Sequence, residues 1–374
     1  MPYIHFDLPE YPVKADVWDK LALEKRPIAV YGMGNGADKL INRFGKYGIE
    51  IADFFASDGF VRGHSFHGKR VKSYSEISEE YPDFVIAVSF ASSRPEVLEL
   101  ISARDSEREL YIPDMPVAGE DEYFDRAFFN ENYSEILKAY NSLADGYSRN
   151  LFAATVNYKL FGKLSFLEGA YSTKDELYSL LPCGSIKTVI DAGAYNGDTA
   201  REAGEYFPRL CEVIAVEPDP RSYRKLKAYA EGEKRFSVRT VNAAVWSEDG
   251  EGDFIGSGNR NSSISSTASH EHKLSEVPLL RIDGIARGRV DYIKYDVEGA
   301  ELEALVGSRE VISSYRPALL VSAYHRSRDI FSLVNYIHGE YPFYKLYLRR
   351  LRCIPAWELD IIAIPEEQIQ DDKA

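Results

Sequence analysis

A short apolar segment, a glycine-rich turn and an amphipathic helical pattern follow one another twice in this 374-residue chain. The first copy runs from Pro27–Tyr31, through Gly32, Gly34 and Gly36, into a helical pattern over 37–47. The second runs from Thr188–Asp191, through Gly193 and Gly197, into a helical pattern over 199–206. A strand, a glycine turn and a helix open a doubly wound parallel sheet. Two openings therefore predict two α/β domains, as the chain length also favours.

The predicted organisation is a smaller Rossmann-like α/β domain over residues 1–115, a helical connector over 116–184, and a second Rossmann-like domain over 185–374. In the first domain, Ile49–Phe55 and Asp83–Ser89 are the further strand candidates. Aromatic residues at helical spacing characterise the connector. Seven strands are predicted in the second domain, at Lys187–Asp191, Val213–Glu217, Val238–Ala244, Tyr292–Asp296, Ala318–Ala323, Tyr344–Arg349 and Leu359–Ile364. Helices are predicted between them over 200–206, 222–230 and 300–313.

Net charge and cysteine content exclude several classes of protein. The formal net charge is −14, which disfavours a nucleic-acid partner because like charges repel. The one basic cluster, Arg349, Arg350 and Arg352, alternates with leucines and predicts a charged strand face. Three scattered cysteines indicate a reducing compartment. Because no apolar stretch approaches the ~20 residues that span a bilayer, and no leader pattern opens the chain, we expect a cytoplasmic protein.

The second glycine turn is paired with an acidic strand end. Asp191 ends the first predicted strand, and Glu217 ends the next one along the chain. S-adenosylmethionine needs close backbone approach at its amino-acid portion, which Gly193 and Gly197 allow, and a carboxylate for its two ribose hydroxyls, which Glu217 supplies. NAD would require a third glycine for its pyrophosphate. The pattern therefore favours S-adenosylmethionine.

Over residues 188–365 the chain resembles the FkbM family of methyltransferases. The matching segments are Val189–Thr199, Ala215–Pro218, Asn242–Gly250, Asn261–Ile264, Ile282–Asp283, Asp291–Glu301, Leu305–Gly307, Tyr324–His325, Asp329 and Tyr344–Arg349. The resemblance implies a class I methyltransferase fold and transfer of a methyl group from S-adenosylmethionine to a hydroxyl of a sugar, polyketide or related small molecule. We expect the cofactor to be bound by Asp191, Gly193, Ala194, Gly197, Asp198, Thr199, Glu217 and, at the adenine, Asn242.

The candidate catalytic residues follow the fourth and fifth predicted strands of the second domain. Lys294, Asp296 and Glu298 alternate along the chain and therefore share one face. Asp296 is expected to act as general base, to orient the acceptor hydroxyl, or to ligate a divalent cation together with Glu298. His325 is the expected general base at neutral pH. Lys294 completes the expected catalytic set.

Two further segments bear on the substrate. Residues 256–269 are rich in serine, asparagine and glycine, which is typical of a loop or lid, and their hydroxyls and amides suit a polyhydroxylated acceptor such as a sugar. Residues Gly32–Gly36, with Phe54–Asp58 and Val85–Ser89, resemble the nucleotide-binding domain of PglD-type sugar acyltransferases. That resemblance implies a nucleotide or nucleotide-sugar ligand at Gly32–Gly36.

Alternative functions stay open at this stage. One is a nucleotide-sugar-binding protein whose methyltransferase-like domain is catalytically degenerate. Another is an NAD-dependent oxidoreductase, which the incomplete glycine pattern at Gly193 disfavours. The sequence does not distinguish a monomer from a homo-oligomer, nor does it identify the acceptor among sugars, glycoconjugates and nucleotide-sugars.

Overall fold

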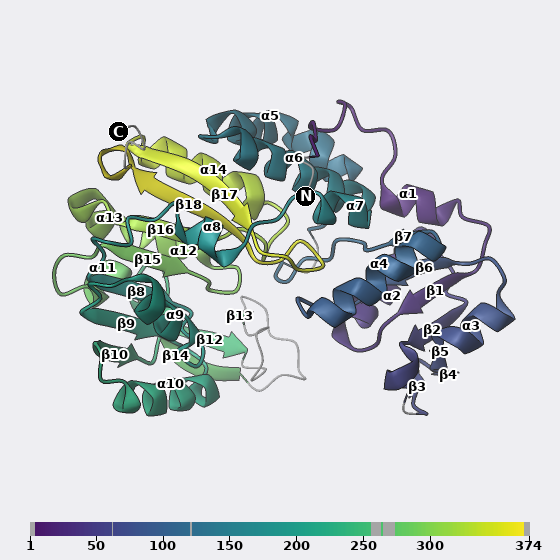
Figure 1. Cartoon of the computed structure of the whole chain (residues 1–374), viewed down its shortest axis with the longest axis horizontal. Helices are drawn as coiled ribbons and strands as arrows, with labels where there is room; N and C mark the ends of the chain where they lie inside the picture. Colours follow the sequence, from purple (N-terminus) through teal and green to yellow (C-terminus); the bar gives the residue numbers. More distant parts are fainter. Residues whose placement is uncertain (1–3, 62, 120–121, 256–262, 265–273, 370–374) are drawn as a thin grey trace.

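The structure is a computed structural model that describes residues 4–61, 63–119, 122–255, 263–264 and 274–369. Figure 1 shows two α/β bodies, with a group of helices lying across the top of their junction. Each body is built on its own sheet, which is parallel in the N-terminal body and mixed in the C-terminal body. The lid predicted over 256–269 falls almost wholly outside the described residues.

The N-terminal body has a five-stranded parallel sheet in the order β5-β2-β1-β6-β7. Its strands are β1 (Ile28–Tyr31), β2 (Asp53–Ala56), β5 (Lys72–Ser73), β6 (Val85–Val88) and β7 (Leu110–Tyr111), and a small hairpin pairs β3 (Ser65–Phe66) with β4 (Lys69–Arg70). Every residue of β1, β2 and β6 is buried, because helices cover both faces of the sheet. These helices are α1 (Val17–Ala22), α2 (Asn35–Tyr47), α3 (Tyr74–Glu80) and α4 (Pro95–Glu107).

The connector forms four helices: α5 (Arg126–Ser142), α6 (Gly146–Phe161), α7 (Leu164–Glu168) and α8 (Lys174–Tyr178). The Asp145 side chain caps the start of α6, and Gly162 ends it in a left-handed conformation with φ of 61°. Leu151 of α6 packs in the core of the C-terminal body, whereas Tyr158 packs with the core of the N-terminal body. The helix α6 therefore joins the two cores, which explains why it is buried on nearly all sides.

The C-terminal body has the seven-stranded sheet that the sequence predicts, in the order β10-β9-β8-β15-β16-β18-β17. Its strands are β8 (Thr188–Ala192), β9 (Glu212–Val216), β10 (Ser237–Val241), β15 (Tyr292–Tyr295), β16 (Ala318–Ser322), β17 (Tyr344–Arg350) and β18 (Leu359–Pro365). β18 runs antiparallel to its two neighbours, β16 and β17, and the other six strands all run in one direction. This arrangement is that of a class I methyltransferase and confirms the predicted fold class.

The helices of the C-terminal body are α9 (Asp198–Tyr206), α10 (Pro220–Gly232), α11 (Ile282–Ile285), α12 (Glu301–Val306), α13 (Arg309–Tyr315) and α14 (Asp329–Glu340). The prediction of one helix over 300–313 is wrong, because α12 ends before Gly307 and α13 begins after it. A Cβ on Gly307 would lie 2.1 Å from the Trp246 carbonyl oxygen. Two further features were not predicted from the sequence, namely α14 and a second sheet. The second sheet has the strand order β11-β14-β12-β13, formed by Ala244–Val245, Leu274–Leu280, Gly250–Ile255 and Ser263–Ile264.

The basic cluster at the end of β17 binds the connector. Arg349 pairs with Asp145 at 3.0 Å, and Arg352 pairs with Glu168 at 2.8 Å. Arg350 is 1 % exposed, and its guanidinium donates to the carbonyl oxygens of Leu167, Ala170 and Cys353. These three arginines therefore join the sheet edge to the helices beside it.

The N-terminal body also contacts the C-terminal sheet directly. Ser92, in the loop after β6, exchanges two backbone hydrogen bonds with Ile354, in the loop between β17 and β18, at 2.7 and 3.0 Å. The backbone N–H groups of Val117 and Ala118 donate to the carbonyl oxygen of His325, at 3.0 and 2.9 Å. These contacts place the N-terminal body and the connector over the carboxyl ends of β15 and β16, where sheets of this kind bind ligands.

Candidate active site

A cavity of about 440 Å³ lies at the carboxyl ends of β8, β9, β15 and β16. Its size falls in the range of about 300–1,000 Å³ that small-molecule and cofactor sites occupy. The turn after β8, the end of β9 and the end of β15 form one side of it, while Ser92 of the N-terminal body and Tyr178 of α8 contribute to the rest. The cavity is therefore completed by parts of the chain outside the C-terminal body.

The turn between β8 and α9 is held close to the neighbouring strands. Gly193 has φ of 92°, and its N–H and that of Ala194 donate to the carbonyl oxygen of Val216 at 3.0 and 2.9 Å. A Cβ on Gly193 would lie 1.9 Å from the Asp296 carbonyl oxygen, and one on Gly197, with φ of 84°, would lie 2.4 Å from the Tyr229 ring. Both positions therefore require glycine, for backbone conformation and for space.

Glu217, the residue predicted to bind the ribose hydroxyls of the cofactor, directly follows β9 and lines the cavity. Its Oε2 accepts the Tyr195 N–H at 2.7 Å, and its Oε1 accepts the Asp219 N–H at 2.8 Å. Burial raises the pKa of Glu217 to about 7 despite these hydrogen bonds. Each carboxylate oxygen has a second lone pair, so Glu217 can also accept hydrogen bonds from a ligand.

Four of the predicted cofactor residues, Asp191, Ala194, Gly197 and Asn242, do not line the cavity. Asp191 is fully buried within β8, with neither carboxylate oxygen hydrogen-bonded among the described residues. Burial raises its pKa to about 7, and the nearby Lys294 ammonium partly offsets that rise. Ala194 is buried, and exposed Asn242 donates its amide to the carbonyl oxygens of Glu217 and Pro218 at 2.8 and 3.2 Å. The adenine contact predicted for Asn242 stays a prediction, because its amide is used here to hold the turn after β9.

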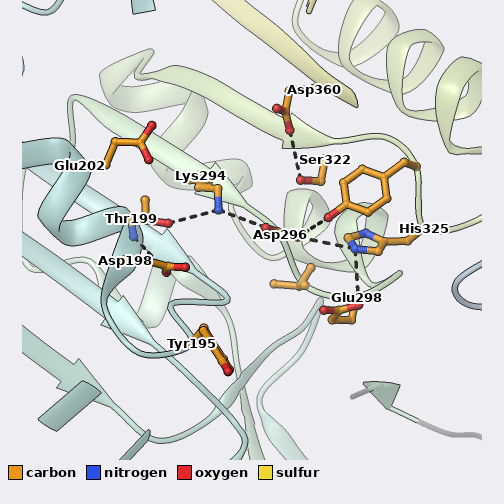
Figure 2. A network of polar contacts seen from close by, with 12 residues as sticks. Tyr195, Asp198, Thr199, Glu202, Lys294, Asp296, Glu298, Ser322, His325 and Asp360 are labelled. Carbon is orange, nitrogen blue, oxygen red and sulfur yellow. Dashed lines mark hydrogen bonds and ion pairs between the residues drawn. The ribbon is translucent and has the colours of Figure 1, made fainter. Parts of the chain in front are cut away.

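Lys294 connects the glycine turn to the predicted catalytic carboxylate (Figure 2). Its Nζ donates to Thr199 Oγ1 at 3.2 Å and to Asp296 Oδ2 at 3.1 Å. Burial alone would lower the pKa of Lys294, but the negative charges of Asp296 and Asp191 raise it by more than burial lowers it. The pKa therefore lies above its ordinary value, and the side chain is cationic. The exposed Asp198 lies beside Thr199 at the start of α9 and also lines the cavity.

His325, the general base expected from the sequence, is buried beside three carboxylates. It is 1 % exposed, and its Nδ1 lies 2.9 Å from Glu301 Oε1. Its Nε2 lies 3.5 Å from both Asp296 Oδ1 and Glu298 Oε2. Burial lowers the pKa of His325, but Glu301, Glu298 and Asp296 together raise it to about 10. The three carboxylates therefore favour the protonated imidazole, and the role of His325 as general base stays a prediction.

Asp296 takes the central place in this network. Lys294 contacts one carboxylate oxygen, while the Tyr324 hydroxyl, at 3.4 Å, and His325 face the other. The Asp296 side chain is 28 % exposed and lines the cavity. Asp296 therefore lies between Lys294 and His325, at a position that a substrate in the cavity can reach.

Asp296 and Glu298 are the two residues predicted as ligands of a divalent cation. Both carboxylates face His325 Nε2. In the part of the chain that the structure describes, no group of three or more His, Cys, Asp or Glu side chains is placed to hold a metal ion. Metal binding by this pair stays a prediction.

Several residues that line the cavity were not predicted from the sequence: Ser92, Lys174, Tyr178, Tyr195, Glu202, Tyr292, Trp357, Glu358 and Asp360. Two of them carried a detectable signal. Tyr292 precedes Lys294 by two positions in β15 and so shares its face, and Asp360 is a charged residue within the apolar strand β18. Ser92 and Tyr178 carried none, because only long-range packing brings them to the cavity.

The N-terminal glycine turn has a structural explanation. A Cβ on Gly36 would lie 2.0 Å from the carbonyl oxygen of Ser89, so α2 could not approach β6 with a larger residue there. Lys39, one turn into α2, donates to the carbonyl oxygens of Pro116 and Val117 at 2.9 and 3.2 Å. A nucleotide ligand at Gly32–Gly36 stays a prediction.

Comparison with protein families identifies the C-terminal body. Residues 191–348 match the model of the methyltransferase FkbM domain. The structure of the whole chain is similar to the crystal structure of methyltransferase FkbM from Methylobacillus flagellatus KT, with a TM-score of 0.67 and 21 % identity, over 96 % of this chain and 94 % of that chain. Because both bodies and the connector are covered, the two proteins share the overall fold.

A second solved structure is more distantly similar. It is fibrillarin from Aeropyrum pernix with bound S-adenosyl-L-methionine, at a TM-score of 0.33 and 14 % identity, over 50 % of this chain and 72 % of that chain. Comparison with curated proteins found no match. None of the described helices is both long enough and apolar enough to cross a membrane.

Proposed function

We propose that this protein, a methyltransferase of the FkbM family, transfers the methyl group of S-adenosylmethionine to a hydroxyl group of a sugar, a glycoconjugate or a related small molecule. One observation carries the proposal. A single cavity is lined both by Glu217, beside the glycine turn, and by Asp296, at the centre of the polar network. A cofactor subsite and a candidate for hydroxyl activation are therefore contiguous, as a direct transfer requires.

The cofactor subsite, which is the part of the cavity around Glu217, fits S-adenosylmethionine. Glu217 offers two carboxylate oxygens at the end of β9, already oriented by the N–H groups of Tyr195 and Asp219. Tyr195 has φ of 45°, an unfavourable conformation for a residue other than glycine, and lines the cavity beside Glu217. Hydrogen bonds from two ribose hydroxyls would stabilise the charged form of Glu217 and thereby lower its raised pKa.

The second subsite activates the acceptor hydroxyl. Bound S-adenosylmethionine supplies a methyl group that its positive sulfur already makes reactive. Asp296 would accept a hydrogen bond from the acceptor hydroxyl and take its proton as the oxygen bonds to the methyl carbon and the carbon–sulfur bond breaks, its electron pair passing to sulfur. Lys294 and His325 hold this carboxylate from either side, so it is well positioned but weakly basic. Most of the rate enhancement then comes from proximity and orientation, since effective molarities reach about 10⁵ M or more in well-oriented reactions.

Calorimetric titration with S-adenosylhomocysteine and, separately, with NADH tests this function. We expect S-adenosylhomocysteine to bind with a micromolar or tighter dissociation constant and NADH to give no heat of binding. Binding of NADH alone would overturn the proposal in favour of an oxidoreductase. Absence of binding by either compound would instead favour a degenerate domain.

A further inference from the structure

The loop between β17 and β18, residues 351–358, joins the N-terminal body to the cavity. Four of its residues line the cavity: Leu351, Cys353, Trp357 and Glu358. Two residues between them, Ile354 and Ala356, are buried in the core of the N-terminal body, and Ile354 exchanges backbone hydrogen bonds with Ser92. The N-terminal body therefore holds one side of this loop while the other side faces the cavity.

Unfavourable backbone conformations are concentrated around the cavity. Among the described residues, those other than glycine with a positive φ are His67, Tyr195, Glu298, Arg316 and Glu358. Three of them, Tyr195, Glu298 and Glu358, line the cavity. Conformations of this kind persist only where the surroundings fix them, and they cluster at functional sites. Glu358, with φ of 57°, directly follows Trp357, so the strained position lies at the end of the loop that faces the cavity.

Trp357 lies close to Asp296. The Tyr324 hydroxyl donates to Asp296 Oδ1 at 3.4 Å, and the rings of Tyr324 and Trp357 are stacked, with their centroids 6.4 Å apart and an interplanar angle of 25°. Both rings line the cavity and are partly exposed. A single side chain, that of Tyr324, therefore separates the indole from the carboxylate proposed to activate the acceptor hydroxyl.

The indole and the carboxylates near it suit the ring of a sugar. The face of an aromatic ring carries partial negative charge and packs well against C–H groups, which both faces of a pyranose ring offer. Asp296, Glu298 and Glu358 line the same cavity. Each carboxylate has about four lone-pair sites, so it can accept hydrogen bonds from sugar hydroxyls in addition to its contacts within the protein. A flat aromatic acceptor would also stack, but it offers these carboxylates fewer hydroxyl groups.

We propose that Trp357 selects the methyl acceptor, which is a pyranose sugar whose ring stacks on the indole and presents one hydroxyl to Asp296. This inference rests on the proposed function and assigns an acceptor-binding residue to it. Because Ile354 and Ala356 anchor the same loop in the N-terminal body, that body takes part in acceptor selection by holding Trp357 in place.

Five small molecules test the proposal: the methyl pyranosides of glucose, galactose and mannose, the open-chain polyol sorbitol, and phenol. Each is titrated calorimetrically into the wild-type protein saturated with S-adenosylhomocysteine. Sorbitol has sugar hydroxyls without a ring, and phenol has a ring and a hydroxyl without the further hydroxyls of a sugar. We expect at least one pyranoside to bind about tenfold more tightly than both of them. Binding of sorbitol or phenol as tight as that of every pyranoside, or no binding of any pyranoside, would overturn the proposal.

Variants of Trp357 then locate the ring. Trp357→Leu should weaken binding of the preferred pyranoside about tenfold, because stacking is lost, whereas Trp357→Phe should stay within threefold of wild type. Trp246→Leu is the matched control, because Trp246 is also partly exposed but does not line the cavity. All three variants should bind S-adenosylhomocysteine like the wild type, which also shows that they are folded. Undiminished pyranoside affinity in Trp357→Leu, or an equal loss in Trp246→Leu, would refute the assignment.

Tryptophan fluorescence gives a second measurement. The chain contains three tryptophans, of which Trp18 is buried in the N-terminal body. Saturation with the preferred pyranoside should change the emission of the wild type and of Trp246→Leu, but not that of Trp357→Phe. An unchanged emission in the wild type, or a change that persists in Trp357→Phe, would show that the sugar does not contact this indole.

The failure of this proposal is distinguishable from that of the proposed function. Binding of S-adenosylhomocysteine without binding of any pyranoside would leave the methyltransferase function standing and remove the role of Trp357. Pyranoside binding that depends on Trp357, in a protein that does not bind S-adenosylhomocysteine, would instead remove the methyltransferase function and leave a sugar-binding site.

Discussion

Glu217 has two tasks, since it holds the turn after β8 through Tyr195 and faces the cavity. Glu217→Ala should lower the affinity for S-adenosylhomocysteine by about tenfold or more, because hydrogen bonds to a charged group contribute about 1.5–3 kcal/mol. Calorimetric titration measures this change. The matched control is Asn242→Ala, because Asn242 does not line the cavity and its exposed amide donates to the backbone carbonyl oxygens of Glu217 and Pro218, in the turn after β9. An equal loss in both variants would mean that Glu217 acts only through the turn.

His325 gives the molecule a stability that depends on pH. Its folded-state pKa of about 10 lies above the ordinary value of 6.5, so its stabilisation is complete below pH 6.5 and is lost as the pH rises through 10. His325→Gln should therefore lower the free energy of unfolding by about 3 kcal/mol at pH 6, as removal of a buried ion-pair partner does. The deficit relative to wild type should shrink at pH 10.

Urea unfolding of both proteins at pH 6, 8 and 10 measures this effect, and the difference between them isolates His325 from other titrating groups. A deficit that does not change between pH 8 and pH 10 would show that the imidazole is already neutral at pH 8 in the folded protein. That result would restore the general base that the sequence predicted for this position.

At the scale of elements, the turn between β8 and α9 is fixed by two strands at once. Gly193→Ala should destabilise the protein by more than about 2 kcal/mol and abolish binding of S-adenosylhomocysteine, because its Cβ would overlap the Asp296 carbonyl oxygen and φ is 92°. Gly232→Ala is the control, since a Cβ at the end of α10 would meet no atom within 4 Å. Unfolding and titration experiments on both variants check this. Normal cofactor binding in Gly193→Ala would contradict the tight packing of this turn on β15.

The elements around the site were predictable where local pattern decides them. The apolar strand that contains Val189 ends before Gly193, and the one that contains Val213 ends before Glu217. The alternation of side chains along β15 predicted that Lys294 and Asp296 share one face. The break between α12 and α13 was not predictable, because Gly307 is required by its contact with Trp246 rather than by the helical pattern. Asp360 was missed for a related reason, since its surroundings come from other strands.

At the scale of the whole molecule, the sequence predicted two α/β bodies but not how they meet. Ile354 lies between two strands of the C-terminal sheet, yet its side chain packs in the core of the N-terminal body, and its backbone pairs with Ser92. The carbonyl oxygen of His325 accepts N–H groups from Val117 and Ala118. Such contacts join residues more than two hundred positions apart, and no periodicity in one segment encodes them. They nevertheless place parts of the N-terminal body and connector in the wall of the active site.

These contacts predict that the whole chain unfolds as one cooperative unit. The connector helix α6 contributes to both cores, and Arg350 donates to the carbonyl oxygens of Leu167 and Ala170 in the connector. Neither body can therefore unfold without exposing the other's apolar surface. Differential scanning calorimetry should show a single transition whose calorimetric and van't Hoff enthalpies agree. Added S-adenosylhomocysteine should move that entire transition to higher temperature, because a ligand stabilises everything that unfolds with its site. Two transitions, of which the ligand moves only one, would show instead that the N-terminal body is an independent domain and that its contacts with the active site contribute little to stability.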